Sequence, residues 1–213
     1  MKPTLLAISG WAHGLDGIKP VGDALADRFD VRLLTGAQVL RERVVPSADY
    51  IVTGSMGGLL AMELLPENCK KLVLISSTAR FCAGDGYECG TPERVLKRMI
   101  LQLKRNPEAV LDAFFKNVHF PHPAPKTNPG CPHDELVKGL EYLLASDVRE
   151  KVPTLGIPVL LLHGAEDRII PASASEWLHT HLPDSRLMVF KNSGHALPAH
   201  QFDKTMEEIG RFI

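Results

Sequence analysis

Three polar residues, each just after a short apolar run, are of the types that hydrolytic chemistry needs. Ser55 follows the run at 50–53, Asp167 follows the run at 159–162, and His195 follows the run at 186–190. An alcohol is a poor nucleophile at neutral pH unless a base takes its proton and a carboxylate orients that base. The three residue types together predict Ser55 as a nucleophile, His195 as its base and Asp167 as the residue that orients the base.

Small residues flank Ser55 in the way that a tight turn from a strand into a helix requires. Gly57 stands two positions after the serine, and Thr53 stands two positions before it, where glycine is usual. Gly58 would let the following helix approach the sheet, and the positive end of that helix would face a developing oxyanion. The alternative is a glycine-rich turn that merely connects a strand to a helix.

The order of these residues along the chain, serine then aspartate then histidine, is the order that α/β-hydrolases use. Asp167 and His195 both follow predicted strands, and open α/β sheets place their ligands at the carboxyl ends of the strands. Taken alone, Asp167 would be an ordinary loop acid and His195 a capping or core histidine; together with Ser55 they predict a catalytic triad. We interpret His200 and Asp203 as residues at the start of a helix.

Two backbone amides are predicted to stabilise the oxyanion. One belongs to Met56, which follows the nucleophile, and the other belongs to Trp11 in the loop after the first apolar run. Gly10 permits the sharp turn of that loop, and Ser9 stands where the usual motif has histidine. His13 is either a substrate contact or a plain loop histidine, and the sequence favours the loop residue.

Short apolar runs alternate with helical patterns along the chain, which predicts an α/β fold with a mainly parallel sheet of about six strands flanked by helices. The expected strands cover residues 5–8, 29–34, 50–53, 71–75, 159–162 and 186–190. The expected helices of this framework cover residues 18–28, 56–65, 172–182 and 202–212. Between the second and third strands lie only residues 35–49, for which no full helix is expected.

The stretch from about 80 to 152 contains no convincing strand and interrupts this alternation. It predicts helices near 92–103, 107–117 and 134–144, which we interpret as a helical lid inserted into a single domain of residues 1–213. A separate second domain is the alternative. Phe114 and Phe115 in this stretch are expected either to line an apolar acyl channel or to form the stripe that packs the lid onto the sheet.

Composition excludes several other classes of protein. The chain is 45% apolar and carries 24 basic against 25 acidic residues, so its charge of −1 gives no general attraction to nucleic acid or to an anionic membrane. No apolar run approaches the roughly 18–20 residues of a membrane span. The first apolar run is too short for a signal peptide, so we expect a mature N-terminus and a cytoplasmic location. No cofactor is expected.

Cysteine and histidine residues gather between positions 82 and 133, and these are residue types that bind zinc. Their spacings differ from those of common zinc fingers, and no pair has the Cys-x-x-Cys pattern. We therefore expect scattered loop and core residues rather than a structural metal. The residues concerned are Cys82, Cys89, His119, His122, Cys131 and His133.

These motifs together resemble the α/β-hydrolase superfamily over nearly the whole chain apart from the insertion. Within it, the sequence is most similar to the pimeloyl-[acyl-carrier protein] methyl ester esterases of biotin synthesis. The similarity lies in Trp11 after the oxyanion-loop glycine, in the segment 140–149 with Asp147 and Arg149, and in the aromatic run 113–115. It implies a serine carboxylesterase that acts through an acyl-enzyme, with Trp11 and Met56 also contacting substrate.

Three other functions stay open at this point. They are a general short-chain esterase, a carbon–carbon bond hydrolase without a carrier partner, and a non-catalytic binding protein on the same fold. The chain lacks the antiparallel strand pair with which this family usually begins, and the interval 35–49 shortens a rim of the site. Substrate size is therefore not fixed by the resemblance.

Basic residues are concentrated in the first helix of the insertion. The stretch 93–105 contains five basic residues against the single acid Glu93, a local charge of +4. Such a patch could attract an acidic acyl carrier protein, although a solvated helix face is the commoner meaning of a run of charges. The five residues are Arg94, Lys97, Arg98, Lys104 and Arg105.

Overall fold

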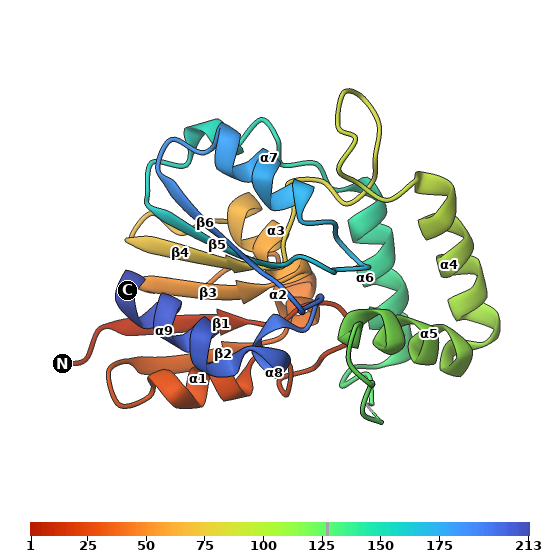
Figure 1. The fold of residues 1–213 in the computed structure, drawn as a ribbon, viewed down its shortest axis with the longest axis horizontal. Helices are drawn as coiled ribbons and strands as arrows, with labels where there is room; N and C mark the ends of the chain where they lie inside the picture. The colour runs from red at the N-terminus through yellow and green to blue at the C-terminus, as the bar shows by residue number, and fades with distance from the viewer. Residues whose placement is uncertain (127) are drawn as a thin grey trace.

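The computed structural model describes residues 1–126 and 128–213, and within these residues six parallel strands form one sheet in the order β2-β1-β3-β4-β5-β6 (Figure 1). The strands are β1 (Thr4–Ile8), β2 (Asp30–Leu34), β3 (Tyr50–Gly54), β4 (Lys71–Ile75), β5 (Val159–Gly164) and β6 (Ser185–Phe190). Each coincides with an expected strand to within two residues at either end. Neighbouring strands pair in parallel throughout, so all six carboxyl ends lie at one edge of the sheet.

Helices cover both faces of the sheet. On one face lie α1 (Lys19–Leu25), α8 (Leu197–His200) and α9 (Phe202–Phe212). On the other lie α2 (Gly36–Glu42), α3 (Met56–Glu63), α7 (Ser173–His181) and the short 3-10 helix η1 (Val152–Thr154). No described helix is both long and apolar enough to cross a bilayer.

The strands bury their two faces in two separate hydrophobic clusters. In β1, Leu6 and Ile8 belong to the cluster that includes α3, whereas Leu5 and Ala7 belong to the cluster that includes α1 and α9. This alternation follows from the two-residue period of a strand. Because both faces are covered, every residue of β5 is buried, which is why the strand reads as a continuous apolar run.

The interval between β2 and β3 contains a helix that the sequence analysis did not expect. Helix α2 begins with a capping box, in which Thr35 Oγ1 accepts a hydrogen bond from the Gln38 amide at 3.0 Å. The Gln38 side chain in turn accepts one from the Thr35 amide at 2.9 Å. The expectation that this interval lacks a full helix was therefore wrong, because reciprocal capping stabilises even a helix of seven residues.

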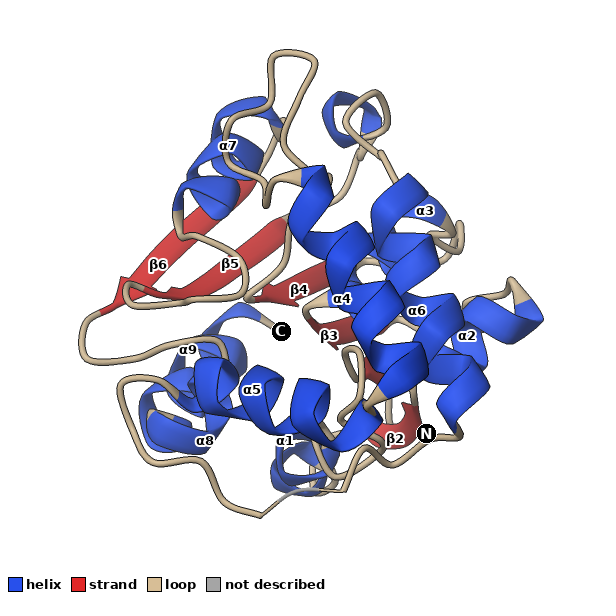
Figure 2. Cartoon of the chain, turned by 90° about the vertical axis from the view of Figure 1, so that its right-hand side faces the viewer, coloured by secondary structure: helices blue, strands red, loops and turns tan. Residues whose placement is uncertain are grey.

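Helices α4 (Glu93–Arg105), α5 (Pro107–His119) and α6 (His133–Ala145) lie between β4 and β5 in the chain and form what we call the helical insertion. Figure 2 shows them in front of the carboxyl ends of the strands. In the described part of this segment, strand-like pairing is limited to isolated bridges, as expected. Leu96, Phe114 and Leu140 of the insertion belong to the same hydrophobic cluster as Ile8 of the sheet.

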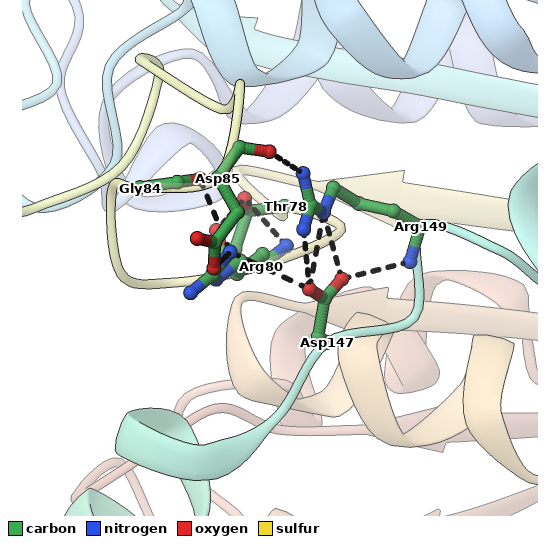
Figure 3. A network of polar contacts seen from close by, with 6 residues as sticks. All are labelled: Thr78, Arg80, Gly84, Asp85, Asp147 and Arg149. Carbon is green, nitrogen blue, oxygen red and sulfur yellow. Dashed lines mark hydrogen bonds and ion pairs between the residues drawn. The ribbon is translucent and has the colours of Figure 1, made fainter.

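The two ends of the insertion are joined by a network of charged side chains (Figure 3). The guanidinium group of Arg149 forms a bidentate salt bridge with the Asp147 carboxylate, with nitrogen–oxygen distances of 2.7–3.1 Å. It also donates a hydrogen bond to the backbone carbonyl of Asp85 at 2.9 Å. Arg80 contacts Asp85 at 2.9 Å and Asp147 at 3.6 Å. The Val148 amide also donates a hydrogen bond to Ala79 O. We call the network of Arg80, Asp85, Asp147 and Arg149 the clasp, because it joins the segment after β4 to the segment that follows α6.

Candidate active site

Ser55 lies at a strained turn between β3 and α3. Its backbone has φ 51° and ψ −121°, a region that non-glycine residues rarely occupy and that is often used at functional sites. The Ser55 amide donates to Ile75 O at 2.9 Å, which ties the turn to β4. A Cβ on Gly57 would lie 2.8 Å from the carbonyl oxygens of Ile8 and Ser9, so only glycine lets α3 begin this close to β1.

Thr53 fits the position where glycine was expected. Its side chain is buried and its hydroxyl donates to Val73 O at 3.1 Å, so the polar atom is satisfied within the sheet. The departure from the usual motif therefore leaves the turn at Ser55 intact. A Cβ on Gly58 would lie 2.9 Å from Cδ2 of Leu74 in β4 and 2.3 Å from the hydroxyl oxygen of Ser77, so Gly58 lets α3 approach the sheet, as the sequence predicted.

Asp167 and His195 are brought together from the loops after β5 and β6. Nδ1 of His195 lies 2.7 Å from Oδ2 of Asp167, and both side chains are almost completely buried. An ionised carboxylate can only accept, so Nδ1 carries the proton and Nε2 is left as an acceptor. Within the described residues, Nε2 is buried and has no hydrogen-bond partner, so it is available to take a proton from substrate or nucleophile.

The Asp167 carboxylate is held ionised by its surroundings. Burial alone would raise the pKa of Asp167, but His195 and a hydrogen bond from His163 lower it further than burial raises it, to well below its usual range. Oδ1 also accepts the amides of Ile169 and Ile170 at 2.8 and 2.9 Å. The carboxylate is therefore a fixed negative charge that orients His195 and can stabilise its protonated form.

His163 is a site residue that the sequence analysis did not single out. It is the last residue but one of β5 and is fully buried, and its Nε2 lies 2.8 Å from Ile170 O and 3.2 Å from Oδ2 of Asp167. Its Nδ1 lies 2.7 Å from the Ser175 hydroxyl. Because the Ile170 carbonyl can only accept, Nε2–H is the donor and the serine hydroxyl donates to Nδ1. His163 thus braces the loop that carries Asp167.

Glu166 also supports the site without having been predicted. Its carboxylate accepts the amides of Asn192 and Ser193 at 3.2 and 2.8 Å, which ties the Asp167 loop to the His195 loop. A Cβ on Gly164 would lie 2.3 Å from Gly194 O, so these loops pack backbone against backbone. The distance between the side chains of Asp167 and His195 is therefore also fixed by these contacts between the two loops.

The loop after β1 lies beside the nucleophile. A Cβ on Gly10 would lie 3.0 Å from the Cβ of Ser55 and 3.6 Å from its Oγ, so the next amide, that of Trp11, belongs to the immediate surroundings of the serine. Among the described residues, neither this amide nor that of Met56 donates to a protein acceptor. Both amides are free to bind the oxygen of a substrate, as an oxyanion hole requires.

Trp11 also attaches this loop to the helical insertion. Its indole Nε1 donates to Leu136 O of α6 at 2.8 Å, and its ring meets Phe114 of α5 edge-on at 4.6 Å. Gly139 of α6 lies against the indole so tightly that a Cβ there would be 2.5 Å from Cδ1 of Trp11. The insertion therefore fixes the position of a predicted oxyanion-hole residue.

Within the described residues, two cavities meet at Ser55. The large cavity, of about 500 Å³, lies under the insertion, and the small cavity, of about 220 Å³, lies between the β1 loop, α1 and the His195 loop. Residues that line the large cavity include Trp11, Phe81, Leu96, Met99, Phe114 and Leu143. Residues that line the small cavity include Gly10, His13, Val21, His119, His195 and Pro198.

Phe114 and Phe115, which the sequence analysis treated as a pair, have different surroundings in the structure. Phe114 lines the large cavity, whereas Phe115 is absent from the walls of both cavities and instead packs against the rings of Phe114 and His13. His13, expected to be a plain loop residue, lies in the wall of the small cavity, where burial lowers its pKa to about 4. Its Nδ1 donates to Trp11 O at 2.7 Å.

The histidines and cysteines of the insertion do not converge. No group of three or more potential ligands that could hold a metal ion occurs within residues 1–126 and 128–213. His119 and His200 approach each other at 3.1 Å, His122 stacks on His200, and the His133 side chain contacts Leu103 O. His200 ends α8, so the interpretation that it starts a helix was wrong, whereas Asp203 does lie in the first turn of α9.

Helix α4 divides its basic residues between two environments. Lys97 pairs with Glu93 at 2.6 Å and Lys104 contacts Glu141 at 3.4 Å, both on the exposed surface. Arg98 and Arg105 are exposed as well, but they lie seven residues apart, and therefore on one side of the helix, and they line the large cavity.

Comparison with known proteins identifies the family. The sequence profile described as "Alpha/beta hydrolase family" matches residues 4–208, which is almost the whole chain. The chain belongs to this family. A curated relative from Nitrosomonas europaea, named pimeloyl-[acyl-carrier protein] methyl ester esterase, is 29% identical over 91% of this chain and 89% of its own length. A relative of the same name from Nitrosospira multiformis is 30% identical over 80% of this chain and 72% of its own.

Solved structures agree on the fold of this α/β hydrolase. The esterase EaEST from Exiguobacterium antarcticum superposes with a TM-score of 0.82, covering 99% of this chain and 92% of the esterase, at 19% sequence identity. At that identity the similarity establishes the fold alone. The expected α/β-hydrolase fold, with a parallel six-stranded sheet flanked by helices, is therefore confirmed.

Proposed function

We propose that this hydrolase is a serine carboxylesterase in which Ser55 is the nucleophile, His195 the general base and Asp167 the residue that orients the base. The observation that carries the proposal is the buried contact of 2.7 Å between Nδ1 of His195 and Oδ2 of Asp167. Ser55 and His195 both line the small cavity of this site. The strained backbone of Ser55 and the free amides of Trp11 and Met56 supply the remaining parts that acyl transfer needs.

The first half of the reaction forms an acyl-enzyme. Ser55 Oγ attacks the carbonyl carbon of the ester while its proton passes to Nε2 of His195, and Asp167 stabilises the resulting imidazolium. The amides of Trp11 and Met56 hold the negative oxygen of the tetrahedral intermediate. When that intermediate collapses, the bond from carbon to the alkoxy oxygen breaks and His195 returns the proton to the leaving alcohol.

The second half releases the acid. His195 takes a proton from water, the resulting hydroxide attacks the acyl carbon, and the same amides stabilise the second oxyanion. The bond from Ser55 Oγ to the acyl carbon then breaks, and His195 returns the proton to the serine. The free enzyme, one carboxylic acid and one alcohol result from one ester and one water.

We propose a medium-length acyl chain as the group that fills the large cavity, with the methyl ester of a carrier-bound pimeloyl chain as the leading natural substrate. The cavity volume of about 500 Å³ and its mainly apolar wall suit an acyl chain. The names of the relatives from Nitrosomonas europaea and Nitrosospira multiformis support the pimeloyl methyl ester. Phe114 is proposed as an acyl contact, whereas Phe115 is proposed only to support Phe114 and His13.

The proposed partner is an acidic acyl carrier protein that docks on the basic residues of α4. Arg98 and Arg105 lie where α4 borders the large cavity, so an acyl arm could pass beside them toward Ser55. Arg94, Lys97 and Lys104 would add long-range attraction, even though Lys97 and Lys104 already have acidic neighbours. Individual exposed pairs contribute only about 0.2–1 kcal/mol, so the effect is expected from the group.

An ester profile tests this function. Methyl esters of mono- and dicarboxylic acids of increasing length are compared, both free and attached to an acyl carrier protein. We expect kcat/KM to rise with acyl length and to be highest for the carrier-bound pimeloyl ester. A maximum at acetate with no advantage from the carrier would instead indicate a general short-chain esterase.

The carrier proposal has its own matched comparison. The double variant Lys97→Glu/Lys104→Glu should lower kcat/KM for the carrier-bound ester by ~10-fold at low salt and much less at high salt. The variant Arg32→Glu/Lys204→Glu changes the same number of exposed charges on β2 and α9, away from the insertion. Equal effects of the two variants on the carrier-bound ester would contradict docking at α4.

A further inference from the structure

Ser55 lies in the wall of both cavities, but His195 lies in the wall of only the small one. Ala196, the residue after His195, also lines the small cavity, whereas the insertion helices α4 and α5 contribute most of the wall of the large cavity. An ester bound at Ser55 extends in two directions from its carbonyl carbon, along the acyl chain and along the alcohol. The two cavities must therefore divide these parts between them.

The proton transfer decides which part lies where. As the tetrahedral intermediate collapses, the carbon–alkoxy bond breaks and the alkoxy oxygen takes its proton from Nε2 of His195. That oxygen must therefore face His195, on the side of the small cavity. We propose that the small cavity is the alcohol site of this enzyme and that it accepts primary alcohols larger than methanol. This inference rests on the roles of Ser55 and His195 proposed above.

The size and lining of the small cavity support an alkyl alcohol. Its volume of about 220 Å³ exceeds what methanol needs, since one water occupies about 30 Å³ of liquid, and it has room for roughly four to six carbon atoms. Ile18, Val21, Ile75 and Pro198 provide apolar surface. The methyl esters named for the relatives would leave much of this space unfilled.

The position of the small cavity also separates the two products. Asp16, Pro20 and Ala199 line it and are themselves exposed, so it opens toward solvent on the side of α1 and α8. The alcohol can leave by this route while the acyl chain stays in the large cavity under the insertion. The hydrolytic water can then reach His195 through the space that the alcohol has left.

The side chain of His13 is consistent with this use. Its ring lies in the wall of the small cavity, and the bond from Nδ1 to Trp11 O leaves Nε2 without a proton. Since burial lowers the pKa of His13 to about 4, the ring stays uncharged at neutral pH. A neutral ring next to His195 does not oppose the positive charge that His195 acquires during catalysis.

The test fills each cavity separately. Ala199→Phe and Pro20→Phe narrow the small cavity from two different walls, and Ala113→Phe narrows the large one; all three residues are exposed, so the larger ring need not disturb the core. Thr180→Phe, on α7 and in the wall of neither cavity, is the matched control. Hexanoate esters of methanol, propanol and butanol, and methyl esters of acids from acetate to octanoate, are followed by titration of released acid.

We expect the wild type to hydrolyse the butyl ester with a kcat/KM on the order of 10-fold above that of the methyl ester, because three further methylene groups become buried. Ala199→Phe and Pro20→Phe should lower that ratio to about 1, whereas Ala113→Phe should keep it and shorten the preferred acyl chain. Thr180→Phe should match the wild type on both series.

Three results would overturn the inference. They are a wild type that favours methyl over butyl esters, a butyl-to-methyl ratio that neither small-cavity variant changes, and a ratio that Ala113→Phe changes instead. Failure of the proposed function has a different signature, in which no ester is hydrolysed or Ser55→Ala hydrolyses esters as fast as the wild type.

Discussion

Replacing Gly139 with alanine should slow hydrolysis by moving Trp11, although Gly139 lines neither cavity at Ser55. The new Cβ would lie 2.5 Å from Cδ1 and 3.0 Å from Nε1 of Trp11, whereas ordinary contacts begin at about 3.4 Å. Phe114 packs edge-on against the indole, and Leu136 O accepts its Nε1–H, so these contacts resist a rotation of the ring alone. We therefore expect the ring and its backbone to shift together.

The size of the effect follows from that displacement. The ring must move by about 1 Å, and an error of this size in a positioning group can cost on the order of 100-fold in rate. Because the amide of Trp11 is proposed to act on the oxyanion, the loss should fall on kcat, by ~10- to 100-fold, with little change in KM for a short ester. Initial rates on p-nitrophenyl acetate give both constants.

A matched substitution separates this effect from a general response to alanine. Gly210 lies in α9, where a Cβ would be 3.4 Å from the end of the flexible Arg28 side chain. Gly210→Ala should keep the wild-type kcat and gain up to ~1 kcal/mol of stability from helix propensity. A folded Gly139→Ala protein with the wild-type kcat would refute the claim that α6 positions Trp11.

Three further predictions concern Asp167, His13 and the clasp. Asp167→Asn should lower kcat by ~10⁴-fold while the far-ultraviolet circular dichroism spectrum stays unchanged, because an amide does not hold His195 in the required tautomer; a kcat within 10-fold of the wild type would contradict this role. The pKa of His13 is lowered to about 4 in the folded protein, whereas an unfolded histidine has a pKa of about 6.5. Between these two pH values the unfolded state binds a proton on His13 that the folded state does not. Proton binding by His13 in the unfolded state should therefore lower the free energy of unfolding by about 2–3 kcal/mol from pH 6.5 to pH 4, so urea titrations of His13→Gln should show a fall that is shallower by about this amount, whereas equal slopes would count against the assignment. Asp147→Ala should lower the free energy of unfolding by about 1 kcal/mol, measured by urea titration, through loss of the partly exposed contact with Arg149, and an unchanged stability would show that the clasp contributes nothing.

The sheet, and the positions of Ser55, Asp167 and His195 at its carboxyl edge, were predictable because local pattern determines them. Strands covered on both faces must be apolar throughout, and this makes a run such as β5 recognisable in the sequence. Once the strands are parallel, the residues after them must meet at one edge, which brings Asp167 and His195 together. Helix α2 escaped detection although Thr35 and Gln38 have capping-box spacing, because a helix of seven residues shows little periodicity.

The supporting contacts were not predictable because they join distant parts of the chain. Trp11 bonds to Leu136 across 125 residues, and no local pattern encodes that contact. His163 lies in β5, four residues before Asp167, so its contact with the carboxylate depends on how the chain folds back after the strand. The adjacent residues Phe114 and Phe115 could have been separated in advance, since neighbours on a helix point about 100° apart.

The central claim, that Ser55 is an activated nucleophile, is tested most directly by its reaction with a fluorophosphonate. Intact-protein and peptide mass spectrometry report how many groups are attached, and to which residue. The proposal predicts a single adduct on Ser55, absent from Ser55→Ala and formed at least ~10³-fold more slowly in His195→Ala. A folded wild-type protein that stays unlabelled, or one labelled on another residue at the same rate in all three proteins, would contradict the claim and favour a non-catalytic binding protein on this fold.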